Sequence, residues 1–280
     1  MRTVSVRAVA DALYDCIGRA SFNLGERETA ALEAARRTET SPTGRAVLDQ
    51  LLENARIACQ ERRPLCQDTG LAVVFLDIGQ QVTLDGGDLV AAINDAVARA
   101  CRDFHLRTSV VAHPLDRRNT GDNSPAVVHV RLVPGDRVRL RFAAKGGGCE
   151  NMSRLAMLTP SAGRAGVVEF VVRTVREALA NPCPPVVVGV GLGGNFEMAA
   201  LAAKESLLRP LGDAAADPRD ADLERELFAA INATGVGPMG LGGANTALAV
   251  HVASLPCHIA ALPVAVNLDC HSHRHAETVL

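Results

Sequence analysis

The sequence predicts an α/β fold, with a helical N-terminal lead-in followed by mixed β-sheet layers and flanking helices. Residues 4–63 carry apolar side chains at helical spacing. From residue 71 to residue 268, short apolar runs bounded by glycine or proline, which are typical of buried strands, alternate with helical segments. We therefore expect a helical lead-in at residues 1–62 and an α/β domain at residues 63–280, merged into one domain.

The composition is that of a folded protein and excludes several classes of function. Hydrophobic residues make up 48% of the 280 residues and charged residues 21%, far from the composition of disordered chains. A net charge of −2 without a basic run, one Tyr and no Trp exclude a base-stacking nucleic-acid surface. The N-terminus has no apolar leader and no run approaches the ~18 residues of a membrane span, so we expect no membrane association and a cytoplasmic location.

The first half of the chain predicts helices, one buried strand and a hairpin. The lead-in helices end at Arg62-Arg63-Pro64, and residues 71–78, LAVVFLDI, predict a buried strand. A helix capped by Asp85-Gly86-Gly87-Asp88 follows and ends near Arg102. Residues 126–142 alternate apolar and polar side chains around a central Pro-Gly-Asp turn, which predicts a hairpin. The other face of this hairpin, which we expect to be solvated, carries Arg137, Arg139 and Arg141.

The second half predicts strands and helices connected by glycine-rich loops. Residues 162–180 predict a helix, and residues 186–190 predict a strand that ends in a glycine cluster before a helix at 196–208. A helix at 219–233 precedes a second glycine loop at 235–243. Strand-like runs at 246–252 and 259–268 complete the sheet.

Three cysteines stand at strand ends and could bind a metal or a cluster. Cys66 begins the stretch Cys66-Gln67-Asp68, which places a soft ligand, an amide and a carboxylate at the mouth of a buried strand. Cys183 and Cys270 also lie at strand ends, and none of the three belongs to a local C-x-x-C pair. Three separated thiolates would leave one position open for Lewis-acid chemistry, although spacing alone favours buried structural thiols. Eight Cys without a secretion signal favour thiols, a metal or a cluster over disulfides.

Other motifs suggest further sites, each with a structural alternative. The glycines after Lys145 could lay free backbone N–H groups against a ligand, or form a flexible turn. Residues 189–194 match G-x-G-x-x-G, but no second strand ending in an acidic residue follows, which argues against a dinucleotide site and leaves carboxylate capture open. His271, His273 and His275 alternate as in a metal triad or an exposed tail, and His258 fits a core or a catalytic histidine.

These motifs together resemble the class I, iron-sulfur fumarases and the related L-tartrate dehydratases. The resemblance covers roughly residues 40–280 and is closest to the α subunit of the two-subunit form. The motifs that carry it are Cys66-Gln67-Asp68-Thr69-Gly70, Lys145-Gly146-Gly147-Gly148 with Glu150-Asn151, Cys183-Pro184-Pro185 before a glycine-rich turn, Gly237-Pro238 to Gly242-Gly243, and Asn267-Leu268-Asp269-Cys270.

The resemblance implies a [4Fe-4S] cluster held by Cys66, Cys183 and Cys270, with the hydroxyacid bound to the fourth iron. It implies catalytic roles for Asp68, in acid–base work, and for His258. The substrate contacts that it implies are Gln67, Arg107 on a carboxylate, Lys145, and the backbone of Gly146, Gly147 and Gly148.

The implied activity is the reversible hydration of fumarate, a C4-dicarboxylate of the tricarboxylic acid cycle, to L-malate. The resemblance further implies an oligomer in which a β subunit carries the remaining catalytic residues. L-tartrate dehydration is the alternative, because Cys149 stands where tartrate dehydratases carry Cys. A nucleotide-binding module and a non-catalytic assembly subunit are the alternatives from another class.

Overall fold

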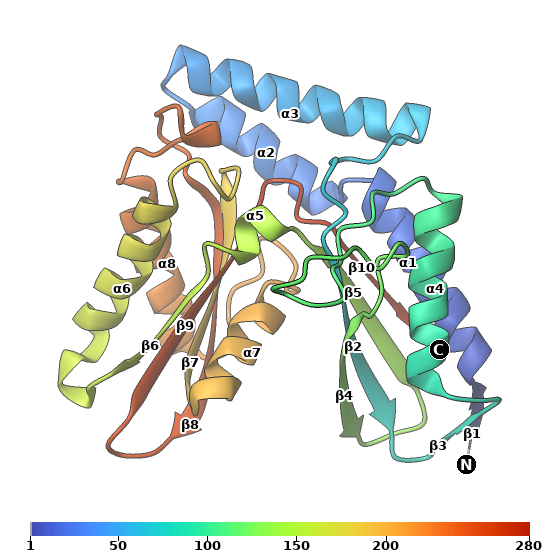
Figure 1. The fold of residues 1–280 in the computed structure, drawn as a ribbon. Helices are drawn as coiled ribbons and strands as arrows, with labels where there is room; N and C mark the ends of the chain where they lie inside the picture. The colour runs from blue at the N-terminus through green and yellow to red at the C-terminus, as the bar shows by residue number, and fades with distance from the viewer. Residues whose placement is uncertain (1) are drawn as a thin grey trace. The chain divides into compact units, whose positions relative to one another are not determined.

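The computed structural model describes residues 2–280 and confirms a mixed α/β fold with helices at the N-terminus (Figure 1). The lead-in consists of α1 (Val6–Phe22), α2 (Glu26–Thr38) and α3 (Pro42–Glu61). The chain divides into two compact units that interleave in sequence. Unit 1 comprises residues up to Leu24, Ile57–Gly147 and Arg274–Leu280; unit 2 comprises Gly25–Arg56 and Gly148–His273.

Unit 1 contains a four-stranded sheet with two helices on one face. The strand order is β10 (His275–Val279), β5 (Val138–Lys145), β2 (Leu71–Gly79) and β4 (Val127–Val133). A short parallel pair, β1 (Arg2–Ser5) and β3 (Val82–Asp85), stands apart from this sheet. Helices α1 and α4 (Leu89–Asp103) supply one side of the buried core, and β2 and β5 supply the other. The core includes Val9, Leu13, Val74, Leu76, Ile93, Val97 and Leu140.

The hairpin predicted at residues 126–142 is wrong. β4 and β5 lie on opposite sides of β2, with β4 parallel and β5 antiparallel to it. The reason is that β2 is almost wholly buried and needs a neighbour on each edge for its backbone groups. The prediction of a solvated face is also wrong at Arg141. Its side chain is 9% exposed, pairs with Asp77 and lies over the ring of Phe75.

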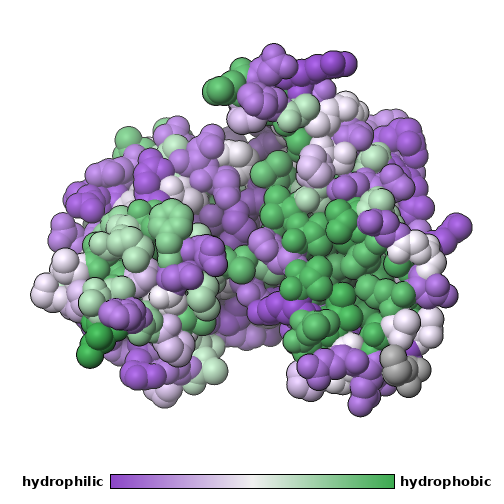
Figure 2. Space-filling model, turned by 60° about the horizontal axis from the view of Figure 1, so that its bottom comes forward, coloured by the Kyte–Doolittle hydropathy of each residue, from purple (hydrophilic) through white to green (hydrophobic). Residues whose placement is uncertain are grey.

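The edge strand of unit 1 carries exposed hydrophobic side chains. β4 has a neighbour on one side only, and its Val127, Val130 and Leu132 are exposed. Figure 2 shows a gathering of hydrophobic residues, in green, on the surface at the right of the picture. Open strand edges and apolar patches of this kind are typical of surfaces that other chains cover.

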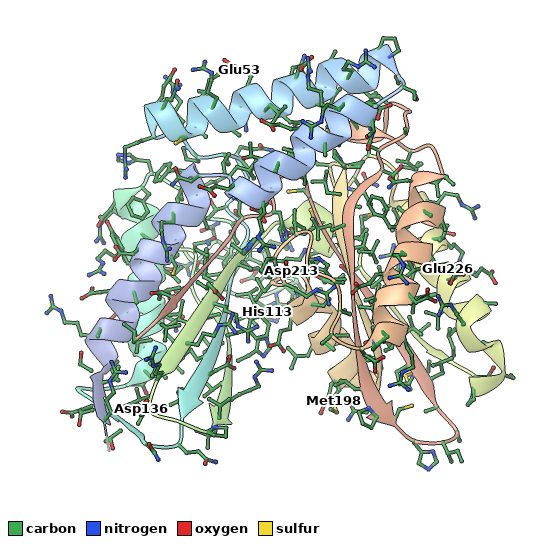
Figure 3. The ribbon with its side chains drawn as sticks, turned by 180° about the vertical axis from the view of Figure 1, so that it is seen from behind. Glu53, His113, Asp136, Met198, Asp213 and Glu226 are labelled. Atoms are coloured by element: carbon green, nitrogen blue, oxygen red, sulfur yellow. The ribbon has the colours of Figure 1, made fainter. Side chains whose placement is uncertain are left out.

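Unit 2 contains a second four-stranded sheet with helices on both faces. The strand order is β6 (Arg154–Leu158), β9 (Leu262–Asp269), β7 (Val186–Gly194) and β8 (Ala247–Cys257). Helices α6 (Gly163–Ala178) and α8 (Pro218–Asn232) pack on one face, and α7 (Phe196–Ser206) packs on the other. Figure 3 labels Glu226 of α8, which accepts a hydrogen bond of 2.6 Å from Arg164 of α6 and ties these helices together.

The glycine cluster after residue 188 is part of β7 rather than a loop. Gly189 and Gly191 face α7, where an added Cβ would lie 2.1 Å from the Ala203 carbonyl oxygen and 2.0 Å from that of Ala199. These glycines therefore let the helix lie directly on the strand. The G-x-G-x-x-G match is explained by this packing, because its backbone pairs in the sheet with β8 and β9 instead of facing a phosphate.

Buried Glu39 fixes the corner between α2 and α3 in unit 2. Its carboxylate accepts backbone N–H groups from both its own turn and the end of the 235–243 glycine loop, including those of Ser41, Ala244 and Asn245. Burial opposes its ionisation, but the hydrogen bond from the Asn245 side chain and the backbone donors outweigh it and lower the pKa of Glu39. No helix within residues 2–280 has the length and apolar character needed to cross a membrane.

Candidate active site

In unit 1, the carboxylate of Asp68 is held in a defined position by backbone donors. One oxygen accepts the N–H of Gly147 at 2.8 Å, and the other accepts the N–H of Gly70 at 3.0 Å. The side chain remains 24% exposed. A carboxylate oriented by two fixed donors, with part of its surface open, is suited to accepting and returning a substrate proton.

The loop that carries Asp68 depends on a glycine and a buried asparagine. Gly70 has a φ of +73°, and an added Cβ would lie 2.5 Å from the carbonyl of Lys145. Asn123 donates to the Gly70 carbonyl at 3.0 Å and accepts the N–H of Ser109 at 2.7 Å. The Ser109 hydroxyl in turn lies 3.5 Å from Asp68.

Ser109 and Asn123 were missed by the sequence analysis. Both lie in the polar segment without periodicity between Phe104 and Pro125. The polar character of that segment was the available signal, since a long ordered loop is commonly functional.

The structure brings most of the predicted substrate contacts together around Asp68. Arg107 is exposed, with its guanidinium 3.7 Å from the Asp68 carboxylate. Lys145, which is 2% exposed, ends β5 and pairs with Leu71, three residues after Asp68. An added Cβ on the buried Gly146 would lie 3.3 Å from Asp68 and 3.9 Å from the guanidinium of Arg274, a residue that the sequence analysis did not select.

One expectation for the glycine run is corrected. The N–H of Gly147 is not free for a ligand, because Asp68 binds it. Gly148 begins the second part of unit 2, where an added Cβ would meet the carbonyl oxygen of Asn181 at 3.0 Å. The glycine run therefore holds Asp68 in position through Gly147, and this N–H cannot also bind a substrate.

Cys66 stands beside Asp68, and its sulfur accepts one backbone hydrogen bond. The N–H of Asp68 donates to its Sγ at 3.4 Å, while its thiol donates to the amide oxygen of Gln67 at 3.4 Å. The side chain is half-buried. Backbone donors to sulfur stabilise the anionic form that binds metals.

In unit 2, sheet topology gathers three cysteines at one edge of the sheet. Cys183 precedes β7, and Cys270 follows β9, the antiparallel neighbour in which Asp269 pairs with Val187. Nδ1 of His271 lies 2.9 Å from the carbonyl oxygen of Cys183, and this hydrogen bond links the start of β7 to the end of β9. Cys149 lies in the short helix α5 (Gly147–Glu150), which leads into β6 beside the same end of β9.

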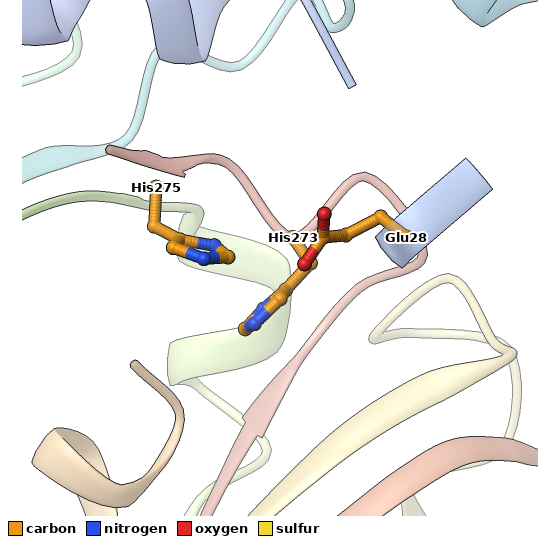
Figure 4. Close-up of side chains that lie close together, drawn as sticks. All are labelled: Glu28, His273 and His275. Carbon is orange, nitrogen blue, oxygen red and sulfur yellow. The ribbon is translucent and has the colours of Figure 1, made fainter. Parts of the chain in front are cut away.

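The environment of Cys270 favours its ionised form. The hydrogen bond from Cys149 lowers the pKa of the Cys270 thiol well below its usual range, although burial acts in the opposite direction. Next to it, the Asp269 carboxylate lies 2.8 Å from Nδ1 of His273. Burial opposes protonation of His273, but the bond and charge of Asp269 outweigh this and raise its pKa. Figure 4 shows Glu28 of α2 beside His273.

His258 is not brought to these cysteines within unit 2. It lies exposed in the turn between β8 and β9, where its Nδ1 accepts the N–H of Ala260. β9 runs from Leu262 near this turn to Asp269 beside Cys270, a span of roughly 23 Å at about 3.3 Å per residue. His258 therefore lies near the start of β9, and the cysteines lie near its opposite end.

The donor set fits a soft metal centre. All eight cysteines are free thiols, and Cys66, Cys183 and Cys270 are each partly accessible. Thiolates are the ligands that iron-sulfur clusters and zinc prefer. None of the three belongs to a C-x-x-C pair, the pattern that is typical of structural zinc sites.

Comparison with known proteins identifies the family of the chain. The model of the family described as "Fumarate hydratase (Fumerase)" matches residues 10–279. A protein of Methanocaldococcus jannaschii named "Putative L(+)-tartrate dehydratase subunit alpha" is 39% identical over 274 residues, which cover 96% of each chain. "L(+)-tartrate dehydratase subunit alpha" of Escherichia coli strain UTI89 is 35% identical over 247 residues, which cover 87% of this chain and 81% of that one.

An α/β fold with an anchored carboxylate and separated thiols, together with these matches, defines an enzyme of the hydro-lyase class. The chain belongs to the fumarate hydratase family.

Proposed function

We propose that this chain, as the α subunit of a two-subunit enzyme, catalyses the reversible hydration of fumarate to L-malate. The observation that carries the proposal is the anchoring of Asp68, whose carboxylate is fixed by Gly147 and Gly70 two residues from Cys66. Adding water across a double bond requires a proton at one carbon and hydroxide at the next, and a positioned carboxylate can transfer that proton.

The cofactor that fits this site is a [4Fe-4S] cluster held by Cys66, Cys183 and Cys270. Three ligand thiolates leave one iron open, and such a cluster when bound supplies a Lewis acid for the hydroxyl oxygen. Support comes from the Asp68 N–H on the sulfur of Cys66 and from the meeting of Cys183 and Cys270 at one sheet edge.

The residues around Asp68 bind the substrate and neutralise its charge. Arg107, exposed and facing the site, binds one substrate carboxylate with its planar guanidinium. Lys145 and the backbone of Gly146 neutralise and orient charge close to Asp68, while Gln67 contacts substrate from the neighbouring position. Asp68 gives its proton to C3 in one direction and removes it in the other.

The second subunit and an oligomer complete the site. The names of the relatives, which are called α subunits, support a β partner that carries further catalytic groups. The exposed hydrophobic edge at β4 supports assembly with another chain. Since His258 lies roughly 23 Å along β9 from Cys270, a catalytic role for it requires that a second copy place it at the site.

L-tartrate dehydration is the second candidate reaction. Two observations favour it: both relatives described above are named for tartrate, and Cys149 occupies the glycine turn before Glu150. The acid–base demands of the two reactions are alike, since both exchange water with a C4-dicarboxylate.

The test is anaerobic purification with the β subunit, followed by iron and sulfide analysis and assays with fumarate, L-malate and L-tartrate. We expect about four irons and four sulfides per α chain, as a [4Fe-4S] cluster requires, and a higher kcat/KM for fumarate than for tartrate. Cys66→Ala should abolish the cluster, and a full cluster in that variant contradicts the ligand assignment. Tight NAD binding by the chain, with no cluster, would instead support the nucleotide module.

A further inference from the structure

Cys149, Asp269 and Cys270 form a compact group of metal-ligand atoms that the proposed cluster does not explain. Their two sulfurs and one carboxylate oxygen all lie within 4.8 Å of one another. Cys149 and Asp269 are buried, at 4% and 6% exposure, and Cys270 is half-buried and so open to a small ion. The three residues come from α5, the end of β9 and the turn that follows it.

The spacing of these atoms suits a single metal ion. In a tetrahedral zinc site, with Zn–S near 2.3 Å and Zn–O near 2.0–2.2 Å, ligand atoms lie about 3.5–3.8 Å apart. The three atoms lie within 4.8 Å of one another, close to that spacing. A cluster, by contrast, distributes its thiolates over different irons, so a sulfur as close to Cys270 as that of Cys149 is poorly placed to be a further cluster ligand.

The surroundings of the group are those of a metal ligand set. His273 contacts one oxygen of Asp269 at 2.8 Å, which orients the carboxylate as a second residue behind a metal ligand does. The sulfur of Cys149 lies 3.4 Å from the Pro182 carbonyl, a weak contact that loss of the thiol proton would release.

We propose that the cluster-free chain binds one Zn²⁺ through Cys149, Cys270 and Asp269, with water in the fourth position. Thiols bind zinc as thiolates, so each zinc that binds displaces the protons still carried by the two sulfurs and forms two Zn–S bonds. Because Cys270 also belongs to the proposed cluster ligands, zinc and the cluster exclude each other. The mutual exclusion of zinc and cluster rests on the proposed function, whereas the binding of zinc is independent of it.

The experiment titrates the full chain, freed of iron by a chelator and kept reduced, with Zn²⁺ and with Co²⁺ as a spectroscopic probe. We expect one equivalent bound, with sulfur-to-cobalt charge-transfer absorption. Cys149→Ser and Asp269→Asn should weaken binding by at least about tenfold, the lower end for disturbed metal sites. Cys66→Ser and Cys257→Ser, which alter cysteines outside the group, should bind as the wild-type chain does.

Cluster reconstitution with iron and sulfide then separates the two proposals. Zinc-loaded wild-type chain should take up no cluster, whereas Cys149→Ser should take it up with zinc present, and Cys66→Ser should bind zinc but no cluster. Zinc binding unchanged in both Cys149→Ser and Cys149→Ala, each checked for folding by circular dichroism, overturns the zinc site. Zinc binding without any cluster in the wild type overturns the proposed function and leaves the zinc site standing.

Discussion

At the scale of single residues, two hydrogen bonds fix the position of Asp68, the carboxylate proposed to act in catalysis. Asp68 accepts hydrogen bonds from Gly70, two residues away, and from Gly147, distant in sequence. The local bond follows from the sequence, because an aspartate two residues before a glycine readily bonds its N–H. The distant bond does not, since it depends on the register of β5 against β2.

Asp68→Asn removes the proton-carrying group and keeps the shape of the side chain. We expect kcat for fumarate hydration to fall by about 10²–10⁴, the usual contribution of general acid–base catalysis. Cluster content should remain that of the wild type, since Asp68 supplies no ligand. Asp116→Asn, at an exposed carboxylate in the same unit, is the matched control and should retain full activity. Wild-type kcat in Asp68→Asn would remove Asp68 from the mechanism.

Buried His251 makes stability depend on pH. Desolvation lowers its pKa to about 3 from the ordinary 6.5, and its Nδ1 lies 3.0 Å from the Ser206 carbonyl. Between these values the unfolded chain binds a proton that the folded chain refuses, so the free energy of unfolding falls as pH falls, by up to about 1.4 kcal/mol per pH unit. Urea unfolding of wild type and His251→Asn at pH 4.5–6.5 should give a shallower pH slope in the variant; parallel slopes contradict the assignment.

Several site residues could be predicted from the sequence, and others could not, for a physical reason. Cys66, Gln67 and Asp68 are contiguous, so any fold places them together. Asn123 reaches Gly70 across 53 positions of sequence, and its role depends on tertiary structure alone. His258 is the opposite case. It lies only 12 residues before Cys270 in the sequence but far from it in space, because the extended strand β9 separates the two residues.

At the scale of elements, β7 shows tertiary packing overriding local propensity. Glycine weakens isolated strands, which is why the sequence predicts a loop after residue 190. The strand continues to Gly194 because its backbone pairs with β8, and to Leu192 also with β9, while Gly189 and Gly191 let α7 pack directly on it. The predicted hairpin failed in a comparable way, since alternation marks a strand but does not identify its partner.

Gly191→Ala should therefore destabilise unit 2. The new Cβ would lie 2.0 Å from the Ala199 carbonyl oxygen, so α7 must move off the sheet. We expect a loss of about 3 kcal/mol, at the upper end for overpacked cores, measured by urea unfolding. Gly147→Ala is the control, because its Cβ would meet only the Asp68 carboxylate at 3.8 Å. An equal loss in both variants would show that packing against α7 is not the cause.

Glu39→Gln tests the corner between α2 and α3. The amide keeps one acceptor oxygen and places an NH₂ group against backbone N–H donors of Ser41, Ala244 or Asn245. We expect a loss of about 1–3 kcal/mol at neutral pH, measured by urea unfolding. Because the pKa of Glu39 is lowered on folding, this contribution is present above the unfolded pKa and is lost as pH falls through the folded value.

The control for this variant is Glu33→Gln, which alters an exposed carboxylate of the same helix. Its ion pair with Arg37 is long, at 4.0 Å, and should contribute little. Equal stability of the two variants would show that the buried hydrogen bonds of Glu39 do not stabilise the corner.

At the scale of the whole chain, the two units are not sequence segments. The chain passes between them after Leu24, Arg56, Gly147 and His273. Local periodicity detects helices and strands but carries no information about which distant segments share a core. The sequence could therefore predict the fold class and most elements, but not that the last residues complete the sheet of unit 1.

Removal of residues 275–280 should consequently destabilise unit 1 far more than a short terminal deletion normally does. β10 pairs along β5, and Leu280 and Val138 exchange backbone hydrogen bonds of 2.8 and 3.0 Å. Without it, β5 loses about five paired positions, and at about 1 kcal/mol per hydrogen bond we expect a loss of several kcal/mol. Hydrogen exchange supplies an internal control: amides of β5 should lose protection, while those of β7 and β9 in unit 2 keep theirs. Equal loss in both units would mean that β10 stabilises the whole chain rather than the sheet it completes.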